Sequence, residues 1–409
     1  MKDFTLKSIA LQDVRVIRDP IHNYITIDNQ VILDLIDTPQ FQRLRRIKQL
    51  GGTSQAYPGG EHTRFSHSLG VYWIVVEMVS KSVIRNCISD YEFLCAMVAG
   101  LLHDLGHGPF SHSFEDIFGD NHELYTVRII KECPQISRIL DRISADMVED
   151  VCRIIEKSHP NSILVSLVSS QLDADRMDYL LRDSYFTGVS YGQFDLARII
   201  RCIRVKDNKL VYKHSGVQAI EDYILARYHM YWQVYFHPVG RSYEIILKSI
   251  FKRIKDLYSR NFDFGDIEYL LPFLNGTVTA CDYTNLDEAV VLYYFHKFTT
   301  CDDAILSDLA RRFLDRDLLG YIDIDSEDNA IVDNIKARQK IRGFDVDYYV
   351  GIDTQQAVLY HYYGDSHQIG EIEIVKNDRL VSFLEMSEIV GAIVNSKKNK
   401  EAHKIYFPK

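Results

Sequence analysis

Over most of the chain, hydrophobic residues recur every three or four positions, which is the spacing of an amphipathic helix. The pattern begins at Val31, and Asp37-Thr38-Pro39 starts an amphipathic run to Leu50 with proline in its first turn. A glycine- and proline-rich loop then covers residues 51–60. We expect further helices over residues 66–88, 91–105, 122–133, 145–157, 162–184, 216–260, 286–299 and 302–316. The long helix over 216–260 could bend at Pro238-Val239-Gly240.

Two regions depart from this helical pattern. Residues 13–28 alternate polar side chains with Val and Ile, which predicts short strands around Asp19-Pro20. After Gly343, the segments 348–350 and 358–363 are β-branched or aromatic, and residues 371–374 alternate. We therefore predict a mainly α fold with N-terminal strands over residues 1–30, a helical domain over 31–342 and a small mixed α/β appendage over 343–409.

Composition narrows the class of protein. The chain has 409 residues, and its net charge of −10 comes from 47 basic and 57 acidic side chains. Nucleic acid is therefore not expected as the main partner, and a polyanionic substrate needs a local cluster of Arg, Lys and metal. No apolar run is long enough for a membrane span, and no signal-peptide core follows Met1. The seven cysteines are scattered without CxxC pairs, which indicates reduced thiols and a cytoplasmic protein.

Histidines gather in one part of the sequence. Of the 15 in the chain, a group lies within residues 62–122, at far higher density than elsewhere. Such clustering is typical of metal or acid–base chemistry. Its members are His62, His67, His103, His107, His112 and His122.

Four residues of this region and the next predict one metal centre. His103 and Asp104 end the apolar run 93–102, where Gly106, Gly108 and Pro109 stop the helix; His67 opens the preceding helix and Asp175 lies in a later one. Imidazole and carboxylate ligands suit Mn²⁺, Fe²⁺, Zn²⁺ or Ni²⁺ and tolerate Mg²⁺, so ligand type does not identify the metal. Taken singly, His67 could be a capping residue and Asp175 part of a solvated helix face.

The segment around Asp175 carries a second pattern. Asp175, Tyr179 and Asp183 are spaced four apart and line one helical face, and Arg176 beside them could reach a phosphate. A salt-bridged helix surface involving Arg182 is the alternative.

These residues resemble the H…HD…D signature of the HD-domain metal-dependent phosphohydrolases. Further stretches are similar to the deoxynucleoside triphosphate (dNTP) triphosphohydrolases of that family, which include bacterial enzymes and the catalytic domain of the animal SAM-and-HD-domain protein. The HD signature alone is shared by many phosphodiesterases, whereas the longer set is specific to the dNTPase branch. The similar stretches are residues 18–22, 37–45, 47–52, 64–71 and 103–112.

The resemblance implies an HD-type helical catalytic domain, with a metal core over about residues 62–184, that splits a dNTP at the α-phosphorus into deoxynucleoside and triphosphate. It implies a divalent metal held by His67, His103, Asp104 and Asp175. It also implies His112 as the catalytic histidine that Glu115 orients, His122 as a second active-site histidine, and His107 near the α-phosphate. Independently of the resemblance, an imidazolium buttressed by a carboxylate can protonate a departing alkoxide.

The resemblance also assigns substrate contacts. Tyr179 and Tyr235 would pack the deoxyribose and exclude a ribose hydroxyl, while Gln49 and Asp183 would bind the 3′-hydroxyl with Leu50 nearby. Phe236 stands where the animal enzyme has a polar residue. The phosphate-gripping cations would be Arg64, Arg176 (a lysine in the animal enzyme) and Arg227.

A second nucleotide site is implied as well. Asp37, Gln42 and Arg45 match residues that read guanine in an activating effector site between subunits, which implies a homo-oligomer, a dimer or a homotetramer. Asp37 as a helix N-cap and Arg45 as a solvated side chain are the alternatives. Arg198, Arg316 and Lys213 match residues that hold effector phosphates, whereas Arg18, Pro238 and Gly320 depart from the animal protein's asparagine and lysines.

Three functions therefore compete. The first is a metal-dependent dNTP triphosphohydrolase activated by a guanine nucleotide. The second is another HD phosphohydrolase that acts on nucleoside monophosphates, cyclic nucleotides or guanosine tetraphosphate. The third is a non-catalytic regulator that senses nucleotides or binds nucleic acid.

Overall fold

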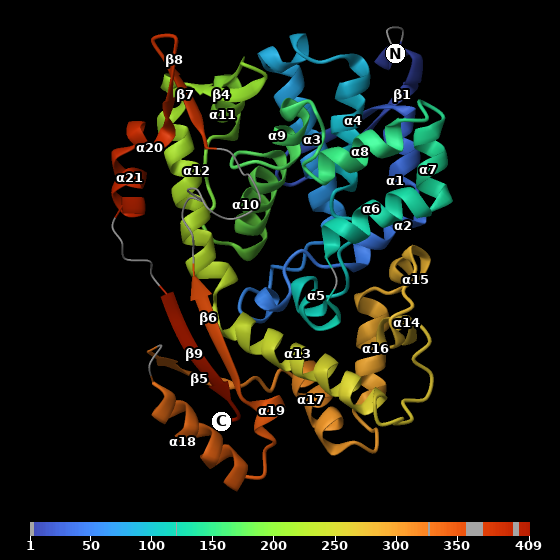
Figure 1. The fold of residues 1–409 in the computed structure, drawn as a ribbon, viewed down its shortest axis with the longest axis vertical. Helices are drawn as coiled ribbons and strands as arrows, with labels where there is room; N and C mark the ends of the chain where they lie inside the picture. Colours follow the sequence, from blue (N-terminus) through green and yellow to red (C-terminus); the bar gives the residue numbers. More distant parts are fainter. Residues whose placement is uncertain (1–3, 120, 326–327, 357–370, 396–400) are drawn as a thin grey trace.

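Helices dominate the structure, and small sheets lie at its margins (Figure 1). This computed structural model describes residues 4–119, 121–325, 328–356, 371–395 and 401–409. The mainly α prediction is confirmed. In the described residues, no helix is both long and apolar enough to cross a membrane.

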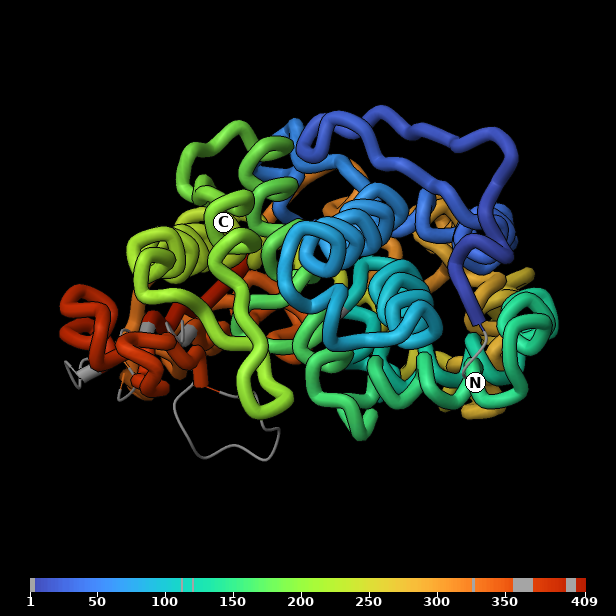
Figure 2. The backbone as a smooth tube through the Cα atoms, turned by 90° about the horizontal axis from the view of Figure 1, so that it is seen from above, coloured from blue at the N-terminus to red at the C-terminus, as the bar shows by residue number. Residues whose placement is uncertain are grey.

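The predicted N-terminal strands are present. β1 (Ala10–Asp19) and β2 (Asn23–Asn29) form an antiparallel hairpin in which Asp19 pairs with Asn23. Seen from above, this hairpin runs along one edge of the helical body, away from the C-terminal segments (Figure 2).

The helices follow the predicted pattern but are broken more often. Their bounds are α1 (Gln30–Ile36), α2 (Pro39–Arg43), α3 (Arg64–Ser80), α4 (Asp90–Leu102), α5 (His112–Phe118), α6 (His122–Glu132), α7 (Pro134–Asp141), α8 (Met147–Ile155), α9 (Ser162–Val168), α10 (Ala174–Thr187), α11 (Leu196–Cys202), α12 (Val217–Met230), α13 (Pro238–Tyr258), α14 (Leu271–Asn275), α15 (Ala280–Asn285), α16 (Glu288–Phe298), α17 (Ala304–Asp315), α18 (Asn329–Ile341), α19 (Val346–Tyr349), α20 (Phe383–Met386) and α21 (Glu388–Asn395).

Local capping explains the main differences from the predicted helices. The single helix expected over 162–184 is two, because the Asp173 side chain accepts a hydrogen bond from the Arg176 backbone N–H and starts α10 afresh. The long helix over 216–260 breaks where expected: a π-helical turn, η6 (Tyr231–Tyr235), follows α12, and Pro238 opens α13. The helix expected from Asp37 to Leu50 ends at Arg43 and continues only as a 3₁₀ turn, η2 (Leu44–Arg46).

Two further sheets involve the C-terminal residues. β3 (Ile203–Lys206), β4 (Lys209–Lys213), β7 (Glu373–Lys376) and β8 (Arg379–Ser382) form one sheet, in which β4 and β7 run parallel. β5 (Gly320–Ile324), β9 (Glu401–Phe407) and β6 (Gly351–Gln356) form the other, which is antiparallel.

The strands predicted for the C-terminal region agree only in part with the strands in the structure. The strand expected over 371–374 overlaps β7, but residues 346–349 form α19 instead of a strand, because Asp345 caps a helical turn there. The segment 358–363 lies outside the described residues. The domain division at 342/343 stays a prediction, although strands on its two sides pair with one another.

The core places three helices around the candidate site. α3 packs against both α4 and α10, and every residue of α4 from Phe93 to Leu102 is buried. The C-terminal end of α4 therefore delivers His103 and Asp104 against the N-terminal halves of α3 and α10.

Close approach of α3 and α10 depends on Gly70. A Cβ atom at this position would lie 1.9 Å from Asp178 Oδ1 and 2.5 Å from Arg182 Nη2, which no side chain tolerates. Gly70→Ala should therefore lower the free energy of unfolding by about 1–3 kcal/mol or more, as overpacking does. Urea unfolding would measure it. Gly240→Ala is the matched control, since its nearest neighbour would be 3.4 Å away; equal losses in both variants would contradict the argument.

Candidate active site

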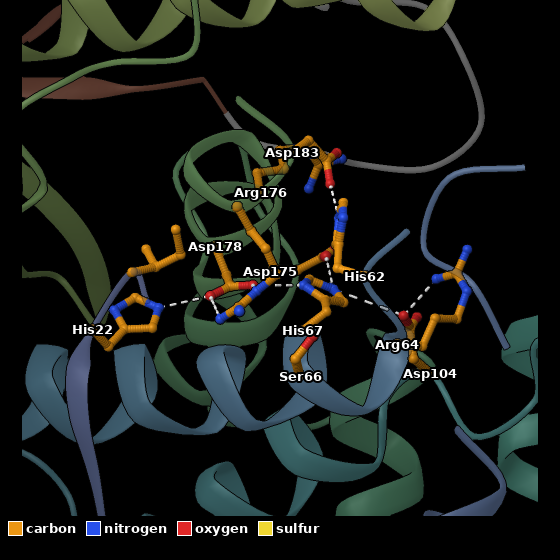
Figure 3. Close-up of polar contacts among 12 residues, drawn as sticks. His22, His62, Arg64, Ser66, His67, Asp104, Asp175, Arg176, Asp178 and Asp183 are labelled. Atoms are coloured by element: carbon orange, nitrogen blue, oxygen red, sulfur yellow. Dashed lines mark hydrogen bonds and ion pairs between the residues drawn. The ribbon is translucent and has the colours of Figure 1, made fainter. Parts of the chain in front are cut away.

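The four predicted metal ligands lie together. Ligand atoms of His67, His103 and Asp175 are all within 4.8 Å of one another. Asp175 Oδ1 is 3.1 Å from His67 Nε2 and 3.7 Å from His103 Nε2. Asp104 joins them, with Oδ1 3.3 Å from His103 Nε2 and Oδ2 3.7 Å from His67 Nε2. Figure 3 shows three of these side chains, from α3, α10 and the end of α4, converging on one point.

Their hydrogen bonds fit a bound cation. His103 Nδ1 donates to the Gly100 carbonyl at 2.9 Å, so in the neutral ring Nε2 carries a lone pair facing two carboxylates. That nitrogen is buried and has no hydrogen-bond partner. A lone pair and carboxylates cannot bond each other, but a divalent cation between them would satisfy all. The mixed nitrogen and oxygen donors do not identify the metal.

The charge of the cluster favours a cation as well. Burial alone would lower the pKa of His67, but hydrogen bonds with Asp175 and Asp178 outweigh it and raise that pKa to about 10. Burial would raise the pKa of Asp175, but His103 and His67 hold it well below its usual range. The carboxylates are thus ionised at neutral pH, and a cation bound between the ligands would take the place of the proton that His67 carries without it.

A buried carboxylate orients His67. Asp178 Oδ2 is 2.8 Å from His67 Nδ1, which turns Nε2 toward the ligand cluster. The same carboxyl group contacts His22 Nε2 at 2.6 Å (Figure 3). It also receives two hydrogen bonds from Arg182, which donates to Asp19 as well. Sequence reasoning missed this role, although His22 and Asp178 fall in stretches that it singled out.

Three of the predicted catalytic residues form a second group. Glu115 Oε1 is 3.1 Å from His107 Nδ1, and its Oε2 is 3.1 Å from His122 Nδ1. The two imidazoles stack 4.0 Å apart, and burial together with Arg64 lowers the pKa of His107 to about 4. His122 Nδ1 donates a hydrogen bond to Glu115 Oε2, and ligand atoms of the three side chains lie within 4.8 Å of one another, so this group too could hold a metal ion. His112 begins α5, but its side chain lies outside the described part of the chain.

Arg64 connects the metal ligands to the turn before α5. Its Nη1 donates to Asp104 Oδ2 at 2.5 Å, and its Nη2 donates to Ser111 Oγ at 2.9 Å. Phe110 and Ser111 have φ values of 57° and 49°, a conformation that costs free energy for residues other than glycine. The turn is therefore held in a strained conformation beside the predicted metal ligands.

Glu288, which sequence reasoning missed, holds this turn. Its Oε1 accepts hydrogen bonds from the backbone N–H groups of Phe110, at 3.3 Å, and Lys48, at 2.9 Å. Phe110 and Gln49, the residue after Lys48, both line a cavity beside the predicted metal ligands. One buried carboxyl group therefore fixes two parts of the cavity wall. Burial raises the pKa of Glu288 to about 7.

This cavity measures about 410 Å³, and the predicted metal ligands Asp104 and Asp175 are part of its lining. The predicted sugar and 3′-hydroxyl contacts lie on it, and Tyr235 donates to Asp183 Oδ2 at 2.7 Å while His62 Nε2 is 2.7 Å from Asp183 Oδ1. Predicted residues in its lining are Gln49, Leu50, Arg64, Asp104, His107, His122, Asp175, Tyr179, Asp183 and Tyr235.

Two predicted phosphate-binding arginines instead bond the turn before α10. Arg176 pairs with Asp173 and donates to the Ser170 carbonyl at 2.8 Å, and Arg227 donates to Gln171 Oε1 at 3.3 Å. Neither is among the residues that line the cavity. Their contact with phosphate stays a prediction.

Three of the predicted effector residues lie close together. Arg45 donates to Gln42 Oε1 at 2.8 Å and stacks on Phe65, while Asp37 ends α1. The alternative that Asp37 is an N-cap is wrong, because Thr38 caps α2.

The remaining effector residues lie elsewhere. Arg198 donates to the Ser215 carbonyl, two residues beyond Lys213, and Arg316 donates to the Gln55 carbonyl. Their effector role stays a prediction.

Removing a metal ligand tests the cluster directly. Asp175→Ala should lose the metal, because the remaining imidazoles and carboxylate cannot complete the coordination. Metal content of the purified variant, measured by elemental analysis, would show this. Asp146→Ala is the control: it removes an exposed carboxylate that makes no side-chain capping hydrogen bond at the start of α8. Full metal content in the Asp175 variant would exclude the proposed ligand set.

The raised pKa of Glu288 predicts how the free energy of unfolding depends on pH. Its pKa is raised on folding, so the native protein is favoured by protonation and wild-type stability falls as pH rises from about 4.5 to about 7. Glu288→Gln should remove this slope, and its stability relative to wild type should rise by up to about 1.4 kcal/mol per pH unit.

Glu288→Ala should instead cost about 1–3 kcal/mol, because two buried amides lose their acceptor. Urea unfolding of the three proteins between pH 5 and pH 8 would separate the effects. Parallel curves for the wild type and the Gln variant would show that Glu288 does not titrate in this range.

Two family models and several known proteins match this chain. A model of the HD domain matches residues 64–183, and one of the HD associated region matches residues 194–409. The chain is 44% identical over 405 residues to the uncharacterised protein YwfO of Bacillus subtilis, which covers 98% of this chain and 93% of YwfO. It is 33% identical over 327 residues to the deoxynucleoside triphosphate triphosphohydrolase SAMHD1 of Homo sapiens, covering 70% of this chain and about half (51%) of SAMHD1.

Solved structures agree with the sequence matches. A phosphohydrolase from Bacteroides thetaiotaomicron superimposes with a TM-score of 0.85 at 29% identity, over 97% of this chain and 100% of that chain. The predicted resemblance is confirmed, and the HD motif residues are the ones that converge in the structure. The chain therefore belongs to the HD-domain phosphohydrolase family, and the deoxynucleoside triphosphate triphosphohydrolases are among its relatives.

Proposed function

We propose that this chain hydrolyses dNTPs at the α-phosphorus and releases deoxynucleoside and triphosphate. The observation that carries the proposal is the shared cavity: two of the predicted metal ligands, Asp104 and Asp175, line it together with Arg64, His107 and His122, and its lining also includes Tyr179, Tyr235, Gln49 and Asp183. A cluster that acted on phosphate alone would not need two tyrosines and a hydrogen-bonding carboxylate beside it. The curated relative SAMHD1 supports the same substrate class.

The chemistry divides between the cation and the protein. A divalent cation held by His67, His103, Asp104 and Asp175 would polarise the phosphoryl group and lower the pKa of a bound water. Arg64, anchored by Asp104 and Ser111, presents a guanidinium to the phosphates.

The histidine group serves the leaving group. Glu115 fixes the ring planes of His107 and His122 from between them. His112, at the first position of α5, is proposed to donate the proton that the 5′-oxygen takes as its bond to phosphorus breaks.

Sugar selection follows from the tyrosines. The rings of Tyr179 and Tyr235 lie 6.3 Å apart in an edge-to-face arrangement, and the Tyr235 hydroxyl is tied to Asp183. A rigid aromatic wall leaves little room for a 2′-hydroxyl, and Asp183 can accept a hydrogen bond from a 3′-hydroxyl.

Regulation is proposed at the surface formed by Asp37, Gln42 and Arg45. A guanine base offers donors to Asp37 and acceptors to Arg45, and the hydrogen bond between Gln42 and Arg45 already orders that arginine. We propose that a guanine nucleotide binds there between subunits of a homo-oligomer, with Arg198, Lys213 and Arg316 on its phosphates.

Product analysis tests the function. Purified protein should release tripolyphosphate from dNTPs in the presence of Mn²⁺ or Mg²⁺, and GTP or dGTP should raise the rate. Chromatography would separate tripolyphosphate from pyrophosphate and orthophosphate. Asp37→Ala should abolish the response to guanine nucleotide and keep the metal.

Other products would assign another reaction. Orthophosphate or pyrophosphate from the metal-loaded protein, or turnover of nucleoside monophosphates, cyclic nucleotides or guanosine tetraphosphate with all dNTPs inert, would favour a different HD phosphohydrolase. Tight nucleotide binding without any turnover would favour a regulator.

A further inference from the structure

Part of the cavity wall is not used by the proposed reaction. Arg241 and Glu244 line the cavity together with Gly51, Thr53 and Phe236, and none of these five residues has a role in the proposed hydrolysis. Arg241 and Glu244 lie in the first two turns of α13, which follows Tyr235 and Phe236 along the chain. The wall therefore continues directly from the proposed sugar contacts.

An ion-pair system from the C-terminal region fixes this wall. Asp353, in β6, receives hydrogen bonds from Arg241 Nε at 3.0 Å and Arg241 Nη2 at 2.6 Å. Asp353 is only 7% exposed, and Gln355 donates to it at 2.7 Å from the same strand. The third guanidinium nitrogen, Arg241 Nη1, pairs with Glu244. Both sides of the guanidinium are thus held, and its orientation is set.

The charge of this system indicates which part of a nucleotide faces it. One guanidinium is shared by Glu244, which lines the cavity, and Asp353, which is buried and does not line it, so these three side chains together carry a net negative charge. A triphosphate placed here would be repelled, whereas Arg64 and a cation held by the predicted metal ligands would attract it. The uncharged nucleobase is the part of a dNTP that suits an acidic wall beyond the sugar.

We propose that Arg241 and Glu244 form the nucleobase wall of the cavity and that Asp353 is a positioning residue that holds it. The inference rests on the proposed function and gives the C-terminal region a role in base selection. The Glu244 carboxylate can accept hydrogen bonds from the exocyclic amino groups of adenine, cytosine and guanine, which thymine lacks. dTTP should therefore be the poorest substrate of the wild-type protein.

The chain offers a matched control on the same helix. Arg253, about three turns further along α13, forms a similar pair with Asp303, with Nε 3.0 Å from Oδ1 and Nη2 2.5 Å from Oδ2. These two residues are not among those lining the cavity. Loss of this pair should affect stability without affecting base preference.

Steady-state kinetics with the four dNTPs would test the proposal on wild type, Asp353→Asn, Glu244→Gln and Asp303→Asn. The ratio of kcat/KM for dATP to that for dTTP should change by on the order of tenfold in the first two variants, as expected for one altered polar contact. It should stay at the wild-type value in Asp303→Asn. A structural role alone would lower all four values together and leave their ratios unchanged.

The outcomes separate the two proposals. If wild type releases tripolyphosphate but Asp353→Asn and Glu244→Gln keep its base preference, the nucleobase wall is excluded and the proposed function stands. If wild type hydrolyses no dNTP, the proposed function fails and this inference fails with it. Should Asp353→Asn not fold, Glu244→Gln decides alone, because its side chain is 23% exposed and tolerates an isosteric change.

Discussion

The active site depends on one buried carboxyl group, that of Asp178. It is fully buried in α10, and it accepts hydrogen bonds from the helix partner Arg182 while contacting His67 from α3 and His22 from the N-terminal hairpin. An isolated carboxylate in this position would be prohibitively expensive to desolvate, so every one of these partners is needed. The contact turns His67 toward Asp175 and brings the two helices so close that only glycine fits at position 70.

Other buried carboxyl groups likewise fix residues around the cavity. Glu288 holds the amides of Lys48 and Phe110, and Asp353 holds Arg241; each carboxyl group comes from a segment distant in sequence from the residue that it fixes. Buried ionic contacts contribute little net stability, because desolvation offsets their attraction. Their value here is geometric: they keep the strained turn at Phe110 and Ser111, and the first turns of α13, in one orientation.

The sequence sufficed to predict which four side chains converge as candidate metal ligands, because they belong to recognisable motifs, and to predict most long helices, because helix starts and ends are encoded locally. His103 and Asp104 follow an apolar run that ends in glycine and proline, and α13 starts at Pro238. The contacts that orient the site were not predictable in this way: His22 and Asp178 are 156 residues apart, and Arg241 and Asp353 are 112 apart. No periodicity links such pairs. The break before α10 was missed because a capping aspartate looks like any other polar residue of a helix surface.

The parallel pair of β4 and β7 has a consequence for how the chain reaches its native state. Tyr212 lies opposite Ile374, so a strand made midway through synthesis waits for a segment that emerges from the ribosome more than 150 residues later. Contacts of such long range slow folding and leave strand edges open to wrong partners in the meantime. The edge of β4 that β7 covers in the folded protein is thus exposed during translation until β7 has been made.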